Sequence, residues 1–130
     1  MKIVEIVFLS LLIVSMASGQ TQSDMNNKAK SEFEKVDARL NQVYQKIIND
    51  YSNDTTFIKN LREAQRLWVK FRDAQVSMKY PSDEEGSVLP MCRCYYLSEL
   101  TSERIKQLKP WIDGEEEGDV CSGSIKMKER

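Results

Sequence analysis

Apolar residues recur at helical spacing along three stretches of this chain. In the first stretch, residues 23–51, they return every three or four positions, and charged residues fill the gaps. This pattern predicts a long amphipathic helix with one face on a core. Ser23 is suited to cap its start, and Asp24 suits the positive end of its dipole. The apolar face consists of Ala29, Phe33, Val36, Leu40, Val43, Tyr44, Ile47 and Tyr51.

The second stretch predicts a central helix from about residue 57 to residue 78. Two polar side chains, Gln65 and Arg72, lie on or beside its apolar face. They need hydrogen-bond partners, because burying an unpaired polar group costs roughly 1 to 3 kcal/mol. The preceding segment has the composition of a turn, with Thr55 or Thr56 suited to cap the helix. The apolar face and its two polar residues are Ile58, Leu61, Ala64, Trp68, Phe71, Gln65 and Arg72.

A third helix is predicted between two prolines. Pro81 disfavours helical backbone at Tyr80 and so ends the second helix. Pro90 fits the first turn of the third, where its missing N–H is not needed, and Pro110 ends that helix near Lys109. Cys94 is in phase with the apolar face of this helix, and no stretch of the chain has the pattern of a strand ladder. The face consists of Leu97, Leu100, Thr101, Arg104, Leu108 and Trp111.

The composition of the two ends predicts three segments. Residues 1–19 have a basic start, a short apolar run and then small residues, which is the order of a secretory signal peptide. The run is shorter than the roughly 20 apolar residues of a membrane-spanning helix. We expect cleavage after Gly19 and export to the periplasm or the medium. Residues 20–112 then form a helical domain, and residues 113–130 form an acidic, cysteine-containing tail.

All three cysteines lie in the C-terminal third, and a disulfide forms and persists in an exported chain. We favour pairing of Cys92 with Cys121, because Cys94 can be buried as a small apolar residue; Cys94 stays possible instead of Cys92. The bond would stabilise the fold by roughly 3 to 4 kcal/mol. The predicted fold class is all-α: a compact antiparallel bundle of three helices with an irregular, disulfide-tethered C-terminal extension.

Five polar residues on or near the apolar faces have two possible roles. They could line a ligand or catalytic pocket, or they could form a satisfied network that sets the register of the helices. The chain has no histidine, and no serine stands beside an evident base. We therefore favour the structural network and expect no catalytic residue, metal site or cofactor. The five residues are Asn41, Gln65, Arg72, Thr101 and Arg104.

Net charge is −1, which argues against nucleic acid as a partner. Acidic residues are concentrated in two places, the loop at residues 82–87 and the tail at residues 113–119. The tail lacks the alternating ligand spacing of a calcium loop. A solvated, flexible segment is the favoured interpretation of the tail.

Four blocks of sequence, in their order and spacing, resemble the LprI-type lysozyme inhibitor family of small exported bacterial proteins. The resemblance covers roughly residues 27–111 and implies a compact helical domain that binds lysozyme without being an enzyme. Many relatives carry a cysteine where this chain has Gln75 and Val76. The blocks are Leu40-Asn41 with Tyr44 and Ile47; Leu61 with Ala64-Gln65-Arg66, Trp68 and Phe71-Arg72-Asp73-Ala74; Gly86-Ser87; and Leu100-Thr101 with Arg104 and Leu108.

Lysozyme, the partner that the resemblance implies, is a basic protein whose cleft holds two carboxylates beside the scissile sugar bond. The hypothesis is that an acidic loop docks there, its acids steering the enzyme and Ser87 reaching toward the catalytic carboxylates. One alternative is an envelope protein-interaction module with no lysozyme activity. A cell-wall enzyme is less favoured, because exposed acids rarely have a raised pKa. The loop consists of Asp83, Glu84, Glu85, Gly86 and Ser87.

Overall fold

The computed structural model is all-helical, as the sequence predicted. It describes the backbone of residues 2–128 and the side chains of residues 21–128. Within that part of the chain no strand forms, apart from an isolated bridge between Glu115 and Met127 in the tail. The helices are α1 (Lys2–Asp50), α2 (Thr55–Lys79), α3 (Leu89–Leu108) and the short α4 (Pro110–Asp113).

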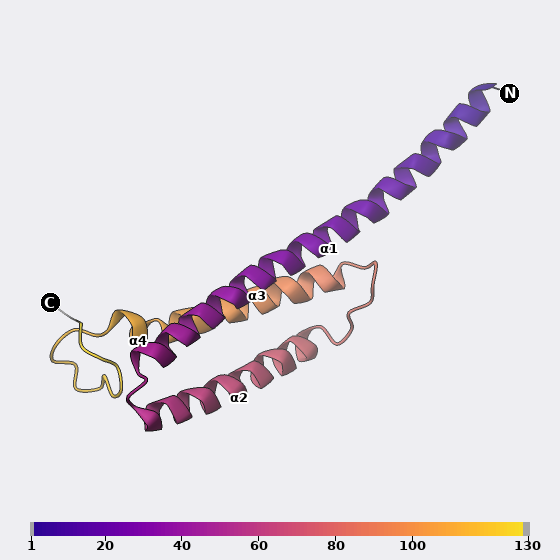
Figure 1. Cartoon of the computed structure of the whole chain (residues 1–130). Coiled ribbons are helices and arrows are strands. Elements are labelled where there is room, and N and C mark those ends of the chain that lie inside the picture. The colour runs from indigo at the N-terminus through magenta and orange to yellow at the C-terminus, as the bar shows by residue number, and fades with distance from the viewer. Residues whose placement is uncertain (1, 129–130) are drawn as a thin grey trace.

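The most extensive helix contact is between α1 and α3. Figure 1 shows these two helices side by side and running in the same direction, with α2 between them in the chain. The C-terminal tail lies beside α4, at the end of the bundle opposite the loop that joins α2 to α3 (Figure 1). The antiparallel packing of the bundle stays a prediction.

The helix ends correct two expectations. Ser23 lies inside α1 and does not cap it, because no proline interrupts the chain before that point and helical backbone continues through it. Asp54, not a threonine, caps α2: its carboxylate accepts a hydrogen bond from the backbone N–H of Phe57 at 2.9 Å. The predicted signal peptide, residues 1–19, lies outside the residues whose side chains are described. Among described residues, no helix is apolar over a length that would cross a bilayer.

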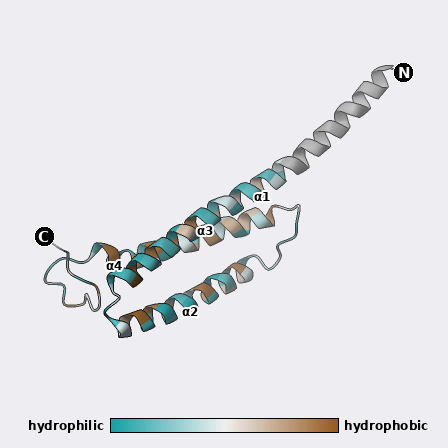
Figure 2. Cartoon of the chain, in the orientation of Figure 1, coloured by the Kyte–Doolittle hydropathy of each residue, from teal (hydrophilic) through white to brown (hydrophobic). Residues whose placement is uncertain are grey.

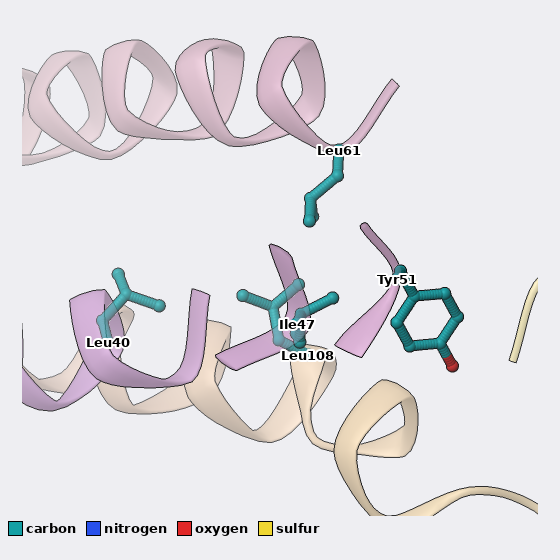
Figure 3. Packing of buried hydrophobic residues seen from close by; sticks show 5 residues of the cluster. All are labelled: Leu40, Ile47, Tyr51, Leu61 and Leu108. Carbon is teal, nitrogen blue, oxygen red and sulfur yellow. The ribbon is translucent and has the colours of Figure 1, made fainter. Parts of the chain in front are cut away.

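A small apolar core joins the first three helices and the start of α4. Figure 3 shows Leu61 of α2 pointing toward Ile47 of α1 and Leu108 of α3. Ile47 is fully buried, and the neighbouring aromatic rings of Tyr51 and Phe57 lie 4.6 Å apart between centroids. The core is therefore concentrated where the α1–α2 turn, α3 and α4 meet. Its buried members are Leu40, Ile47, Tyr51, Leu61 and Leu108.

The prediction that Ala64 and Phe71 face the core is wrong. Both are exposed, and 63% of the surface of Phe71 is accessible. Leu61 and Val76 define the buried face of α2, and at 3.6 residues per turn Phe71 points roughly 100° away from its centre. Figure 2 shows apolar positions interspersed with polar ones along α2. Three large apolar side chains of this helix, Leu67, Phe71 and Met78, are exposed.

The predicted disulfide is also wrong: Cys92, Cys94 and Cys121 are all free. The first two lie in the opening turns of α3, whereas the tail docks at the other end of that helix (Figure 1). Helical rise puts Cys94 roughly 20 Å from the last residue of α3, whereas bonded cysteines have Cα atoms at most about 7 Å apart. Burial raises the pKa of the Cys94 thiol, which keeps it protonated.

Hydrogen bonds hold the tail where a disulfide was expected. The backbone N–H of Lys126 donates to the Tyr51 hydroxyl at 3.0 Å, and the indole N–H of Trp111 donates to Ser124 Oγ at 3.0 Å. Gly114, at φ 73°, passes so close to the returning chain that a Cβ would lie 2.8 Å from the Lys126 carbonyl oxygen. Only glycine fits this crossing without a shift of the backbone.

We predict that Ile47→Ala lowers the free energy of unfolding by about 2 to 5 kcal/mol, because it leaves a cavity in the core. Phe71→Ala, which removes a larger but exposed side chain, should cost less than about 1 kcal/mol. Urea denaturation followed by circular dichroism measures both values. Equal losses for the two variants would contradict this assignment of the buried face of α2.

Candidate functional site

The acidic loop, residues 83–87, presents three carboxylates to solvent at one end of the bundle. Asp83, Glu84 and Glu85 are exposed, and no described residue forms an ion pair or a hydrogen bond with any of their carboxylates. The loop adjoins the start of α3, whose positive dipole end favours nearby negative charge. The loop is therefore a concentrated patch of negative charge on a short connection.

Ser87 holds the acidic loop in shape. Its hydroxyl donates to the backbone oxygen of Glu84 at 2.7 Å and accepts from the N–H of Leu89, the first residue of α3, at 3.2 Å. Its own carbonyl accepts a hydrogen bond from Asn26 of α1 at 3.0 Å. The loop is thus fastened to α1 as well as to α3, and the Ser87 hydroxyl is engaged within it.

Arg72 connects α2 to both neighbouring helices. Its guanidinium donates to Asp37 of α1 at 3.2 Å, to Asp73 at 2.9 Å and, more weakly, to Thr101 of α3 at 3.5 Å. It also lies over the ring of Trp68, 5.2 Å from the centroid. Only 11% of its side chain is exposed. This arrangement pairs a largely buried cation with two carboxylates and leaves no guanidinium face free for chemistry.

Arg104 lies near the same indole. Its guanidinium carbon is 5.7 Å from the Trp68 centroid, and its Nε donates to Gln65 at 3.0 Å. Burial lowers the pKa of its guanidinium. Asn41, in contrast, is exposed and makes no hydrogen bond with the described residues. The structure thus gathers four of the five polar residues around one indole and leaves Asn41 apart.

The acidic tail lies at the opposite end of the bundle from the acidic loop (Figure 1). A hydrogen bond with Asp119, partial loss of solvent and the charge of Asp119 raise the pKa of Glu115. Glu116 pairs with Lys128 at 2.6 Å. Among the described residues, no group of three or more acids or cysteines is arranged to hold a metal. The tail's acids lie at the other end of the bundle and cannot join the acidic loop in one surface.

A second exposed surface was not foreseen: an apolar stripe along α2. Its large members are Leu67, Phe71 and Met78, which are 51%, 63% and 76% exposed. Together with Ala64 and Ala74 they recur at steps of three and four residues, so the five share one side of the helix. The 3–4 spacing was visible in the sequence, but Ala64 and Phe71 had been assigned to the buried face. Exposed apolar stripes of this kind often contact other proteins.

The fold and these surfaces define a small helical protein with an exposed acidic loop at one end and an exposed apolar stripe along α2. The chain belongs to the LprI lysozyme inhibitor family: the family model described as "Lysozyme inhibitor LprI" matches residues 15–108. That description is of an inhibitor, not of an enzyme. A curated relative, the uncharacterized protein R02472 of Rhizobium meliloti (strain 1021), is 28% identical over an alignment 107 residues long, which covers 74% of this chain and 77% of that protein. No solved structure matches the chain.

We predict that Arg72→Ala lowers the free energy of unfolding by about 1 to 3 kcal/mol, since it removes hydrogen bonds to two helices and the contact with Trp68. Arg66→Ala is the matched control on the same helix. It removes an exposed pair with Glu63 and should lower the free energy of unfolding much less than Arg72→Ala does. Thermal and urea unfolding of both variants test this, and a loss at Arg72 no larger than at Arg66 would rule out the connecting role.

Proposed function

We propose that this protein inhibits a lysozyme by non-covalent protein–protein binding, and that the acidic loop docks at the cleft of the enzyme. The observation that carries the proposal is the set of three exposed carboxylates without partners, held on a loop that is fastened to α1 and α3. Membership of the family supplies the kind of partner. The loop's charge supplies the reason for contact with a basic enzyme.

The mechanism assigns different tasks to the residues of the loop. The carboxylates of Asp83, Glu84 and Glu85 attract the cationic enzyme and orient it during the encounter, as complementary charge does in other complexes. Ser87 sets the conformation of the loop through its bonds to Glu84 and Leu89. Because the Ser87 hydroxyl already makes these two hydrogen bonds, we propose that it shapes the loop and does not contact the catalytic carboxylates of lysozyme directly. Bound in this way, the loop would block entry of the polysaccharide.

The proposed setting is outside the cytoplasm, where lysozyme acts on the cell wall. It requires removal of residues 1–19 as a signal peptide and release of a mature chain that begins near Gln20. The free cysteines do not conflict with this setting, because the tail is held by hydrogen bonds to Tyr51 and Trp111.

We predict that the triple variant Asp83→Asn, Glu84→Gln, Glu85→Gln weakens inhibition of a basic lysozyme by roughly tenfold or more, chiefly by slowing association. The effect should shrink as salt is raised, because salt screens exposed charges. A cell-wall lysis assay and binding kinetics at two ionic strengths measure it.

The control for this variant removes the same charge from the tail: Glu116→Gln, Glu117→Gln, Asp119→Asn. Because the tail lies at the other end of the bundle, this variant should inhibit almost as well as the parent protein. Equal weakening by both variants would show that net charge matters and the loop does not. No inhibition by the parent protein would reject the proposed function.

The apolar stripe favours a second candidate function, an envelope protein-interaction module that does not act on lysozyme. Single apolar side chains on a surface are ordinary, but a run at heptad-like spacing is typical of a helix that packs on another protein. In this case the stripe, and not the loop, would be the docking surface.

A variant of the stripe separates the two functions. We predict that Leu67→Gln, Phe71→Gln, Met78→Gln keeps inhibitory potency within about threefold of the parent, because the steering charges remain. The lysis assay compares it with the loop variant. If the stripe variant loses inhibition while the loop variant keeps it, the stripe replaces the loop as the lysozyme-binding surface.

A further inference from the structure

A half-open cavity of about 460 Å³ lies where α2, α3, α4 and the tail meet, at the opposite end of the bundle from the acidic loop. This volume is within the range of small-molecule sites. Most of its wall is apolar, and one cation, Arg104, forms part of it. The apolar side chains that line it are those of Phe57, Leu61, Ala64, Leu108 and Trp111.

Two aromatic rings give the cavity a shape suited to a flat ligand. The rings of Phe57 and Trp111 are nearly parallel, with centroids 6.4 Å apart and planes inclined by 26°. Trp111 donates its indole N–H to Oγ of Ser124, a tail residue that also lines the cavity. Phe57 is fixed by its contact with Tyr51 in the core. Preformed aromatic walls of this kind bind planar apolar groups at low entropic cost.

Arg104 gives the cavity a preference for charge. Its guanidinium donates to two neutral amides, Gln65 at 3.0 Å and Gln107 at 3.3 Å, and no carboxylate among the described residues pairs with it. Arg72, on the other side of the same indole, has two carboxylate partners. A partly desolvated cation without an anion gains from binding one.

Asp54 is the acidic member of the lining, and its carboxylate is engaged as the cap of α2. It forms no ion pair with Arg104, whose side-chain hydrogen bonds go to the amides of Gln65 and Gln107. A purely structural role for Arg104, joining α3 to α2 through Gln65, would explain the hydrogen bonds. It would not explain why the residue also borders an open cavity with aromatic walls.

We propose that this cavity binds a small organic anion with a planar apolar body, whose carboxylate meets the guanidinium of Arg104. The aromatic rings of Phe57 and Trp111 contact the body of the ligand, and Ala64 leaves room for it at the edge of α2. This site is separate from the acidic loop and does not depend on lysozyme inhibition.

The test uses 2-naphthoate and a neutral compound of the same shape, 2-naphthalenemethanol, with the full-length protein in calorimetric titrations. Naphthoate should bind roughly tenfold tighter than the alcohol, because it adds a charge-assisted hydrogen bond. Arg104→Gln should reduce naphthoate affinity roughly tenfold and leave alcohol affinity nearly unchanged. The control Arg62→Gln, an exposed arginine of α2 outside the cavity, should change neither.

A second variant protects the test against misfolding. Ala64→Leu fills the edge of the cavity from an exposed helical position, so it should fold normally and weaken both compounds. The indole N–H resonance of Trp111, assigned with Trp111→Phe, should shift on titration in the parent and not in Ala64→Leu. Equal affinity for the two compounds, no effect of either variant, or no binding at about 10 mM naphthoate would each overturn the proposal.

Discussion

The position of α2 depends on the indole of Trp68 and the two guanidinium groups near it. Arg72 reaches from α2 to Asp37 on α1 and Thr101 on α3, while Arg104 reaches from α3 to Gln65 on α2. Apolar contacts alone hold α2 weakly, since Leu61 and Val76 are its only buried residues among those described. Directional hydrogen bonds and cation–π contacts therefore fix the register of α2 against α1 and α3, which the small apolar core alone would not fix.

The two guanidinium groups differ in how far they are enclosed and in their hydrogen-bond partners. Arg72 is the more enclosed, and its charge is neutralised by Asp37 and Asp73. Arg104 lies nearer the end of the bundle, where the tail and α4 leave a cavity, and amides are its only hydrogen-bond partners among the described residues. Of the two arginines near Trp68, Arg72 is thus neutralised in a structural contact, whereas Arg104 borders the cavity in which we propose that an anion binds.

The helices and their breaks were predictable because local rules determine them. Pro81 and Pro90 bound the acidic loop in the sequence as they do in the structure, and the periodicity of Leu40, Ile47 and Leu61 identified core positions. Phe71 was misplaced because α2 has two apolar sides, and spacing alone does not tell which side meets the core. The cysteine pairing failed because it depends on where the tail docks, and that is decided by Tyr51 and Gly114 far along the chain.

The candidate sites lie at opposite ends of the bundle. Each end is closed by a segment without regular structure. The acidic loop is bonded to Asn26 of α1, and the tail is bonded to Asp50, the last residue of α1, and to the adjacent Tyr51. Because α1 and α3 run side by side between them, the two ends are held at a fixed separation of roughly the 30 Å length of α3. A partner at the acidic loop and a small anion beside Trp111 would therefore bind the same rigid scaffold without touching each other.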